Sequence, residues 1–205
     1  MRSESDIIWL ESVDSTNLEL RRRIRTLANL AVIAAKSQTE GRGQGDHTWH
    51  SRPGENLTAS ILLRFSDIAP LPAAESLFIT RIITLSLTDL LSELGIEARI
   101  KWPNDIWVGP CKICGLLIEN ILRGNEVAES IVGIGLNVNE TAFPADLPNP
   151  VSIASLLGHS LDVSEIALRL RDRIKLRAGM YPDAEGKRKL TEDFDALVFR
   201  LPEEA

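Results

Sequence analysis

The pattern of apolar and polar positions in the first half of the chain predicts short strands separated by helices. Apolar runs too short for helices and bounded by turn residues are typical of strands. Such runs lie at residues 7–10, 30–35 and 57–65. The cap-type residues Asp14-Ser15-Thr16-Asn17 precede an Arg-rich predicted helix over 18–27. After Pro70-Leu71-Pro72, leucines and isoleucines at helical spacing predict the longest helix, roughly 74–94.

The second half begins rich in predicted strands and ends in predicted helices. Strands are expected at 98–101, 106–108, 114–120 and 130–137, and Gly124-Asn125 is typical of a hairpin turn between the last two. An irregular loop, 141–150, carries three prolines. Helices are predicted at 152–157 and 164–178, and the charged tail, 182–205, is predicted to be helical in part. This mixture lacks the regular alternation of a doubly wound sheet, so we predict an α+β fold with a mixed sheet flanked by helices.

Length and composition indicate one ordinary globular domain. The 205 residues are 44% apolar and 25% charged, and we expect a single domain over 1–205, with a core at about 9–139 and a helical C-terminal part at about 152–200. The net charge of −6 argues against a nucleic-acid partner. No apolar run reaches membrane-spanning length, and the first residues lack the order of a signal peptide. We therefore expect a cytoplasmic protein that binds neither nucleic acid nor membrane.

The two cysteines, Cys111 and Cys114, have the C-x-x-C spacing of redox and zinc motifs. A zinc site needs two further ligands, and the histidines show no metal-like pairing with the cysteines. A thioredoxin-like motif opens a helix, whereas the residues that follow here predict a strand. We interpret the pair as two small apolar residues flanking a turn.

A glycine-rich segment, Gly41-Arg42-Gly43-Gln44-Gly45-Asp46-His47-Thr48-Trp49, is suited to gripping an anion, because glycines free the backbone to expose its N–H groups. It departs from G-x-G-x-x-G and from the P-loop, and it leads into a strand instead of a helix. A plain flexible hairpin is the alternative. Arg42 supplies a forked donor for a carboxylate or phosphate, and Trp49 offers a stacking surface for a planar ring.

A second polar segment, Lys101-Trp102-Pro103-Asn104-Asp105, presents an amine, an amide and a carboxylate at a turn made rigid by proline. These groups could bind phosphate, ribose and Mg²⁺ together, although such turns also occur as mere punctuation. Lys112 and Gly115 follow. Farther on, Gly133-Ile134-Gly135-Leu136-Asn137 places glycines in a strand, which indicates either a flat floor for a ligand or a corner of the sheet.

Taken in order, these segments resemble the catalytic domain of the biotin protein ligases. The pattern is Asp-Ser-Thr-Asn, Gln38-x-x-Gly-Arg-Gly with Trp49, Lys-Trp-Pro-Asn-Asp, Lys112-x-x-Gly and Gly-x-Gly-x-Asn, over roughly residues 9–139. The resemblance implies a fold like that of class II aminoacyl-tRNA synthetases. It also implies that ATP and Mg²⁺ convert biotin to biotinyl-5′-AMP, from which biotin passes to a lysine of a biotin carboxyl carrier protein or domain.

The resemblance also implies a role for each motif residue. Lys112 and Arg42 would be catalytic, with Lys101 assisting, and Asp105 would hold Mg²⁺. The biotin site would comprise Ser15, Thr16, Asn17, Gln38, Gly41, Arg42, Gly43, Gln44, Lys112 and Gly115. The nucleotide site would comprise Trp49, Lys101, Asn104, Asp105 and Asn137. A carboxylate and a polyphosphate repel each other, so positive charge at their meeting point suits the reaction.

The sequence departs from the family pattern in three places. Gln44 stands where an arginine is common, which predicts slower adenylation or a leakier intermediate. Few residues precede Asp14, so we expect no DNA-binding helix-turn-helix, and the chain stops near where a small C-terminal β-domain commonly begins. A lipoate ligase or octanoyltransferase of the same fold, or a non-catalytic module that binds biotin or its adenylate, are the alternatives. We expect a monomer or a weak homodimer.

Overall fold

The computed structural model describes residues 7–45 and 47–199, so Asp46 of the glycine segment and the end of the charged tail lie outside the described residues. Within these ranges the strands form one eight-stranded sheet in the order β1-β2-β3-β7-β6-β5-β4-β8. Strands β1 and β2 pair in parallel, as do β4 and β8, and the other neighbours are antiparallel. The strands are β1 (Ile7–Val13), β2 (Val32–Gln38), β3 (Leu57–Arg64), β4 (Arg99–Lys101), β5 (Asp105–Val108), β6 (Cys111–Arg123), β7 (Glu126–Leu136) and β8 (Val198–Phe199).

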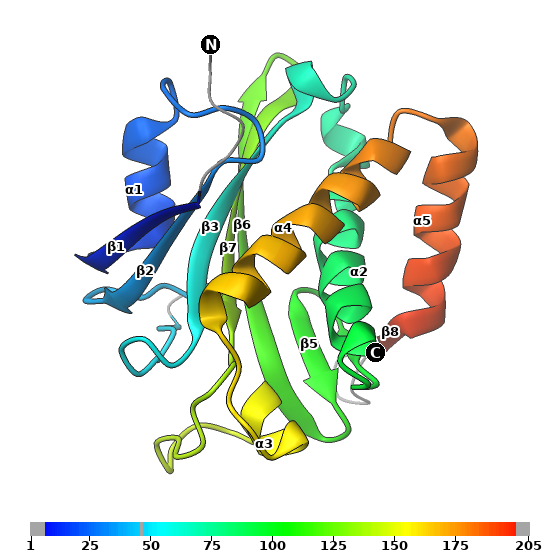
Figure 1. Cartoon of the computed structure of the whole chain (residues 1–205). Coiled ribbons are helices and arrows are strands. Elements are labelled where there is room, and N and C mark those ends of the chain that lie inside the picture. Colours follow the sequence, from blue (N-terminus) through cyan, green and yellow to red (C-terminus); the bar gives the residue numbers. More distant parts are fainter. Residues whose placement is uncertain (1–6, 46, 200–205) are drawn as a thin grey trace.

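Helices lie on both faces of this sheet, which confirms the predicted mixed sheet flanked by helices (Figure 1). They are α1 (Thr16–Arg23), α2 (Leu77–Glu93), α3 (Ile153–Leu157), α4 (Val163–Met180) and α5 (Ala184–Leu197), with short 3₁₀ turns at Phe65–Asp67 and Ala73–Glu75. In Figure 1, α4 crosses in front of the sheet, and α2 and α5 stand beside it. Helix α1 lies at the other end, near β1 and β2.

The alternation of residues in the central strands divides the interior into two unequal cores. In β7, Val132, Ile134 and Leu136 face the larger core, which also receives the buried sides of α2, α4 and α5. Ile131 faces a smaller core beneath α1, together with Leu20 and a few neighbours. Because successive strand residues point to opposite faces, Gly133 and Gly135 lie on the α1 side of the sheet. The short helix α1 leaves the rest of that side open to the functional site described below.

Several predicted boundaries are wrong. Helix α1 begins at Thr16 and ends at Arg23, earlier at both ends than the predicted 18–27. Helix α2 was predicted to be the longest helix, but α4 is one residue longer. The cysteines do not flank a turn, because Cys111 and Cys114 both lie in β6, and the turn precedes them at Gly109. Burial raises the pKa of the Cys114 thiol well above its usual value. The short strand β8 was not predicted at all.

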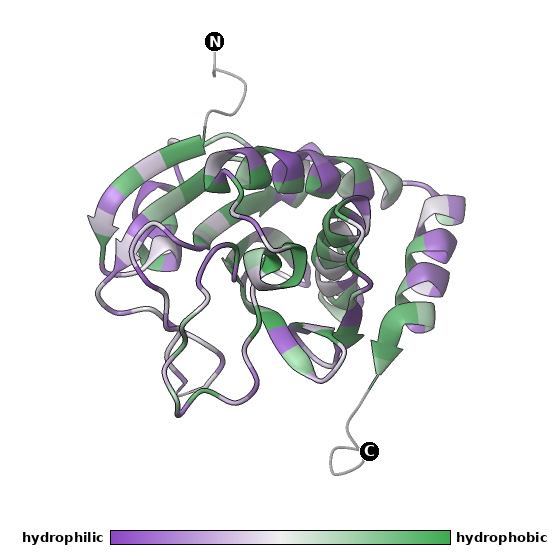
Figure 2. Ribbon diagram, turned by 60° about the horizontal axis from the view of Figure 1, so that its bottom comes forward, coloured by the Kyte–Doolittle hydropathy of each residue, from purple (hydrophilic) through white to green (hydrophobic). Residues whose placement is uncertain are grey.

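Other sequence predictions are confirmed. The hairpin turn at Gly124 joins β6 to β7, and Gly124 has a positive φ of 62°. The 141–150 segment is irregular, and α3 and α4 follow it as expected. Coloured by hydropathy, the helices carry apolar residues on the sides that face the interior of the molecule and polar residues on their outer sides (Figure 2). Within the described ranges, no helix is both long and apolar enough to cross a membrane.

Candidate active site

A cavity of about 630 Å³ opens on the α1 side of the sheet, within the range of about 300–1,000 Å³ typical of small-molecule sites. Its walls come from the start of α1, the end of β2, the glycine segment, the β4–β5 turn, strands β6 and β7, and the 141–150 loop. It brings together every residue that the sequence assigned to a site except Gly41. These are Ser15, Thr16, Asn17, Gln38, Arg42, Gly43, Gln44, Trp49, Lys101, Asn104, Asp105, Lys112, Gly115 and Asn137.

One end of the cavity is a cluster of buried polar side chains. The parallel pairing of β1 with β2 sets Gln38 beside Val13 and hence beside the start of α1. The Oε1 atom of Gln38 accepts the backbone N–H of Thr16 at 2.8 Å and the Thr16 hydroxyl at 3.1 Å. Ser60 reaches from β3 and lies 2.8 Å from Thr16 Oγ1 and 2.5 Å from Asn17 Oδ1. These neighbours hold the polar groups in fixed orientations at a buried position.

The cap predicted from Asp14-Ser15-Thr16-Asn17 takes a different form. Ser15 occupies the cap position without a side-chain cap bond, and Gln38 takes the Thr16 N–H instead. Asp14 accepts from the Ser15 N–H at 2.7 Å and from the Arg22 guanidinium. These hydrogen bonds, that from Arg22 most of all, lower the pKa of the Asp14 carboxyl to about 2. Asp14 therefore fastens the start of α1, and it leaves Thr16 and Asn17 to face the cavity.

Glu119, which no motif in the sequence marked, joins the polar cluster to the glycine segment. Its carboxylate accepts from Asn17 Nδ2 at 3.0 Å and lies 3.4 Å from Arg42 Nη1. Arg42 therefore pairs with Glu119, while Lys112 has a separate partner. Period two along β6 could have revealed this carboxylate, because Gly115 and Glu119 are four residues apart and share a face.

The glycine segment is a hairpin closed on itself, which corrects the expectation of exposed N–H groups. The Gly43 N–H donates to the His47 carbonyl at 2.7 Å, and the Trp49 N–H donates to the Gly41 carbonyl at 3.0 Å. A Cβ atom at Gly41 would lie 2.5 Å from the Trp49 carbonyl oxygen. Glycine at position 41 is thus needed for the two arms of the hairpin to approach each other closely. The hairpin places Trp49 against the sheet.

The Trp49 indole lies against the strand glycines that the sequence pattern indicated to be either a flat floor for a ligand or a corner of the sheet. A Cβ at Gly135 would fall 2.2 Å from Trp49 Cε2, and one at Gly115 would fall 3.0 Å from Trp49 Cζ3. The two glycines therefore let the indole lie directly against β6 and β7. Its Nε1 atom is buried without a hydrogen-bond partner among the described residues. The glycines receive a tryptophan, which in turn lines the cavity.

Lys112 stands beside this indole, paired with Asp105. The Lys112 ammonium lies 2.8 Å from Asp105 Oδ1 and 5.8 Å from the centre of the Trp49 ring. Antiparallel pairing of β5 with β6 sets Asp105 opposite Gly115, close to the Lys112 side chain. The backbone of Lys112 also binds Asn149 and Val151, which anchors the end of the 141–150 loop. The cation is consequently held in the cavity wall, against Asp105 and near Trp49.

The remaining predicted residues line the cavity with part of their hydrogen-bonding capacity already used. Asn104 Nδ2 donates to the Leu116 carbonyl at 2.7 Å, and Asn137 Nδ2 donates to the Val151 carbonyl at 3.0 Å. The peptide bond between Trp102 and Pro103 is cis. Lys101 Nζ lies 5.5 Å from the centre of the Trp107 ring. Trp107 and the loop residues Phe143, Leu147 and Pro148 also line the cavity, and no motif in the sequence had marked them.

Among the described residues, no group of three or more His, Cys, Asp or Glu could hold a metal ion by itself. Asp105 is the acidic residue in the cavity lining. Mg²⁺ commonly binds one or two carboxylates and completes its shell with water and substrate phosphates. The donor set fits Mg²⁺ in that manner, as a companion of a polyphosphate rather than as a resident metal.

More than half of the chain is similar in sequence to a known family of ligases. Residues 9–137 match the family described as Biotin/lipoate A/B protein ligase family. The chain is 34% identical over 134 residues to the bifunctional ligase/repressor BirA of Bacillus spizizenii, covering 64% of this chain and 40% of that protein. It is 31% identical over 160 residues to the biotin–[acetyl-CoA-carboxylase] ligase of Paracoccus denitrificans, covering 76% of this chain and 66% of that one.

A solved structure shows the same fold. The biotin protein ligase from Aquifex aeolicus, in complex with biotin and ATP, superposes with a TM-score of 0.80 at 28% identity. The match covers 95% of this chain and 78% of that one. The curated relatives are longer, since the chain spans 40% of the Bacillus protein and 53% of the Salmonella typhimurium relative.

Proposed function

Because the chain belongs to the biotin/lipoate A/B protein ligase family, we propose that it activates biotin with ATP and transfers the biotinyl group to a lysine of a carrier protein. One observation carries the proposal. A single cavity holds a buried polar cluster, a lysine ammonium and a tryptophan platform. These suit, in turn, a polar head group, a pair of repelling anions and a planar base.

The polar cluster is the feature that favours biotin as the acid. Thr16, Asn17, Gln38 and Ser60 carry hydroxyl and amide groups that match the N–H and C=O groups of a ureido ring. An octanoyl chain or a dithiolane ring presents no such partners. A site built to hydrogen-bond a ligand discriminates strongly against one that leaves its buried polar groups unpaired.

Lys112 is assigned to the meeting point of the two substrates. In the first step a biotin carboxylate oxygen attacks the α-phosphorus of ATP, and the bond to pyrophosphate breaks. The Lys112 ammonium lowers the repulsion between the carboxylate and the phosphate, and Asp105 fixes its position at 2.8 Å. In the second step the carrier's lysine amine attacks the acyl carbon, AMP leaves, and the nitrogen loses a proton.

Trp49 and Asp105 are assigned to the nucleotide. The indole offers a stacking face to adenine, and the lining residues Phe143 and Leu147 limit the entry of water. Asp105 would hold Mg²⁺ through its carboxylate when the nucleotide brings the ion in. Bound there, Mg²⁺ would supply positive charge to the phosphates.

The proposed acceptor is a biotin carboxyl carrier protein or domain. Support comes from the Paracoccus denitrificans relative, whose name assigns it to acetyl-CoA carboxylase.

Transfer to a carrier domain tests the proposal. The protein is incubated with ATP, an apo carrier domain and either biotin, lipoate or octanoate, and acylation of the carrier is measured by mass spectrometry. We expect the biotinylated carrier to form only with ATP and biotin. Modification by lipoate or octanoate instead would assign the site to another acid of the family. Binding of biotin without any acylated carrier would make the protein a non-catalytic module.

A further inference from the structure

Glu140 is a fully buried carboxylate that the proposed chemistry does not use. It follows β7 by four residues, and its side chain is 0% exposed. Among the described residues, it is outside the set that lines the cavity. Burying a carboxylate is costly unless charged and hydrogen-bonding partners compensate for it. The identity of those partners therefore indicates what the carboxylate does.

In the part of the chain that the structure describes, the side-chain partners of Glu140 come from residues 50–56, the arm of the glycine hairpin that returns to β3. Glu140 Oε2 accepts the Asn56 amide at 2.6 Å and the Arg52 backbone N–H at 3.2 Å. Glu140 Oε1 has no hydrogen bond among the described residues. It faces the His50 imidazole Nε2 at 3.5 Å and the Arg52 guanidinium Nε at 3.7 Å instead.

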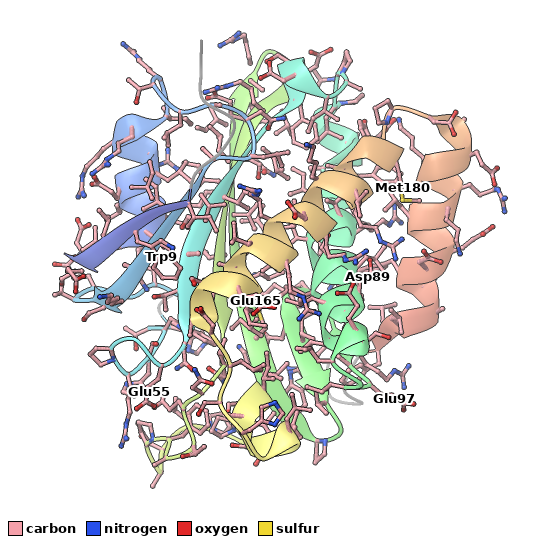
Figure 3. All side chains as sticks on the ribbon, viewed as in Figure 1. Trp9, Glu55, Asp89, Glu97, Glu165 and Met180 are labelled. Atoms are coloured by element: carbon pink, nitrogen blue, oxygen red, sulfur yellow. The ribbon has the colours of Figure 1, made fainter. Side chains whose placement is uncertain are left out.

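Further hydrogen bonds hold this arm on the segment that follows β7. The Val138 N–H donates to Asn56 Oδ1 at 2.9 Å, and the Asn139 N–H donates to the Glu55 carbonyl at 2.8 Å. Figure 3 labels Glu55 in the loop that enters β3. The arm and the end of β7 thus form one fastened unit, with the Glu140 charge inside it.

Trp49 directly precedes this unit along the chain and lies on Gly135 of the same strand, β7. No hydrogen bond within the described ranges fixes the indole, because its Nε1 atom has no partner there. Its position on the glycines accordingly depends on where the arm beginning at His50 is held. Glu140 holds that arm.

We propose that Glu140 is a positioning residue for nucleotide binding, which fixes the returning arm and thereby seats Trp49 against β7. This role rests on the proposed function, in which Trp49 contacts the nucleotide. Glu140 itself touches no substrate. The polar cluster at the other end of the cavity does not depend on this carboxylate, so biotin binding is independent of it.

Glu140→Gln tests the proposal, because glutamine keeps the shape and one acceptor but removes the charge that faces His50 and Arg52. We expect the KM for ATP in biotin-dependent pyrophosphate exchange to rise about five- to tenfold. The Kd of biotin without ATP should stay within about twofold. With fluorotryptophan incorporated, the ¹⁹F signal of Trp49, assigned through Trp49→Phe, should shift or broaden. The Trp102 signal should remain.

Two further variants keep the outcome decisive. Glu93→Gln removes the same charge on α2, where Glu93 pairs with Arg169 and Arg173, and should change neither the ATP KM nor the Trp49 signal. Arg52→Gln, at an exposed side chain, should raise the ATP KM by itself, even if Glu140→Gln proves unstable. The double variant should be no worse than the larger single effect.

The proposal is overturned if Glu140→Gln and Arg52→Gln leave the Trp49 signal and the ATP KM unchanged, or if the ATP KM and the biotin Kd rise together. The ¹⁹F measurement needs no turnover. If the wild-type protein showed no pyrophosphate exchange, the proposed function would fail, and a shifted Trp49 signal would still support the positioning of Trp49 by Glu140.

Discussion

At the scale of single residues, the cavity pairs each of two cations with its own carboxylate. Lys112 pairs with Asp105 at 2.8 Å, and Arg42 lies 3.4 Å from Glu119. The carboxylates hold the cations in place before substrate arrives, so less side-chain freedom is lost on binding. The two pairs lie in different parts of the site, since Glu119 touches the polar cluster through Asn17, whereas Asp105 pairs with Lys112 beside Trp49.

Gln44 is the residue whose replacement should strengthen the proposed activity. It lines the cavity without a charge, at a position where the resembling family commonly has arginine. We predict that Gln44→Arg speeds adenylation and lengthens the half-life of the bound adenylate, each by about tenfold, because a guanidinium binds phosphate more strongly than an amide does. Single-turnover kinetics and the hydrolysis rate of the trapped intermediate measure both quantities.

The matched control for this prediction is Thr26→Arg, which adds the same charge at an exposed position after α1. It should leave both quantities at the wild-type value. An adenylation rate and an adenylate half-life that do not respond to Gln44→Arg would refute the role given to position 44.

At the scale of elements, the alternating side chains of strands β6 and β7 build both the larger core and the floor of the site. Their apolar residues on one face enter the larger core, and glycines on the other face receive Trp49. The alternation along β7 is legible in the sequence, so the strand and its glycines were predicted. The side chain that covers Gly135 was not predicted, because Trp49 comes from a hairpin more than 80 residues away in the chain.

Gly135→Ala tests this arrangement. The added methyl group would lie 2.2 Å from Trp49 Cε2, so the indole must move off the strand. We predict that the KM for ATP rises by about tenfold or more while the Kd of biotin stays within about twofold. Gly179→Ala on α4 is the control, since a Cβ there meets nothing within 4 Å. An unchanged ATP KM in Gly135→Ala would show that seating Trp49 on β7 does not matter.

Element boundaries were predictable only where local signals were strong. Gly124 lies between the ends of β6 and β7, as predicted. The prolines at 70–72 are followed first by the 3₁₀ turn Ala73–Glu75, so α2 begins at Leu77 and not near residue 74. The start of α1 was placed too late, because Thr16 and Asn17 read as cap residues, whereas Gln38 from β2 satisfies the helix start. Strand β8 has only two residues and exists through its pairing with β4, which no local pattern encodes.

At the scale of the whole molecule, the site exists because the two faces of the sheet are covered unequally. Side chains lie close together between α2, α4 and α5 in Figure 3, where Asp89 and Met180 are labelled, and buried apolar residues of these helices belong to the same core as the sheet. That packing stabilises the sheet from one side. The shorter α1 covers only part of the other side and leaves a floor of small residues and polar groups for ligands.

The sequence predicted which residues lie together in the candidate site, but it did not predict which of them contact each other. The order of motifs brought Thr16, Gln38, Lys112 and their companions into one site, and the cavity contains them. The pairing of Arg42 with Glu119 and the burial of Glu140 depend on strand register and on the path of the hairpin. The extent of the domain and the roles of the individual site residues stay predictions.

The central claim is that Lys112 permits a biotin carboxylate to attack the α-phosphate of ATP. The most direct measurement is the biotin-dependent exchange of labelled pyrophosphate into ATP, compared among the wild type, Lys112→Ala and Lys175→Ala, which removes an exposed lysine on α4. We predict exchange only when biotin is present, equal in the wild type and Lys175→Ala, and slower by about 100-fold or more in Lys112→Ala. Exchange by Lys112→Ala at the wild-type rate would contradict the account.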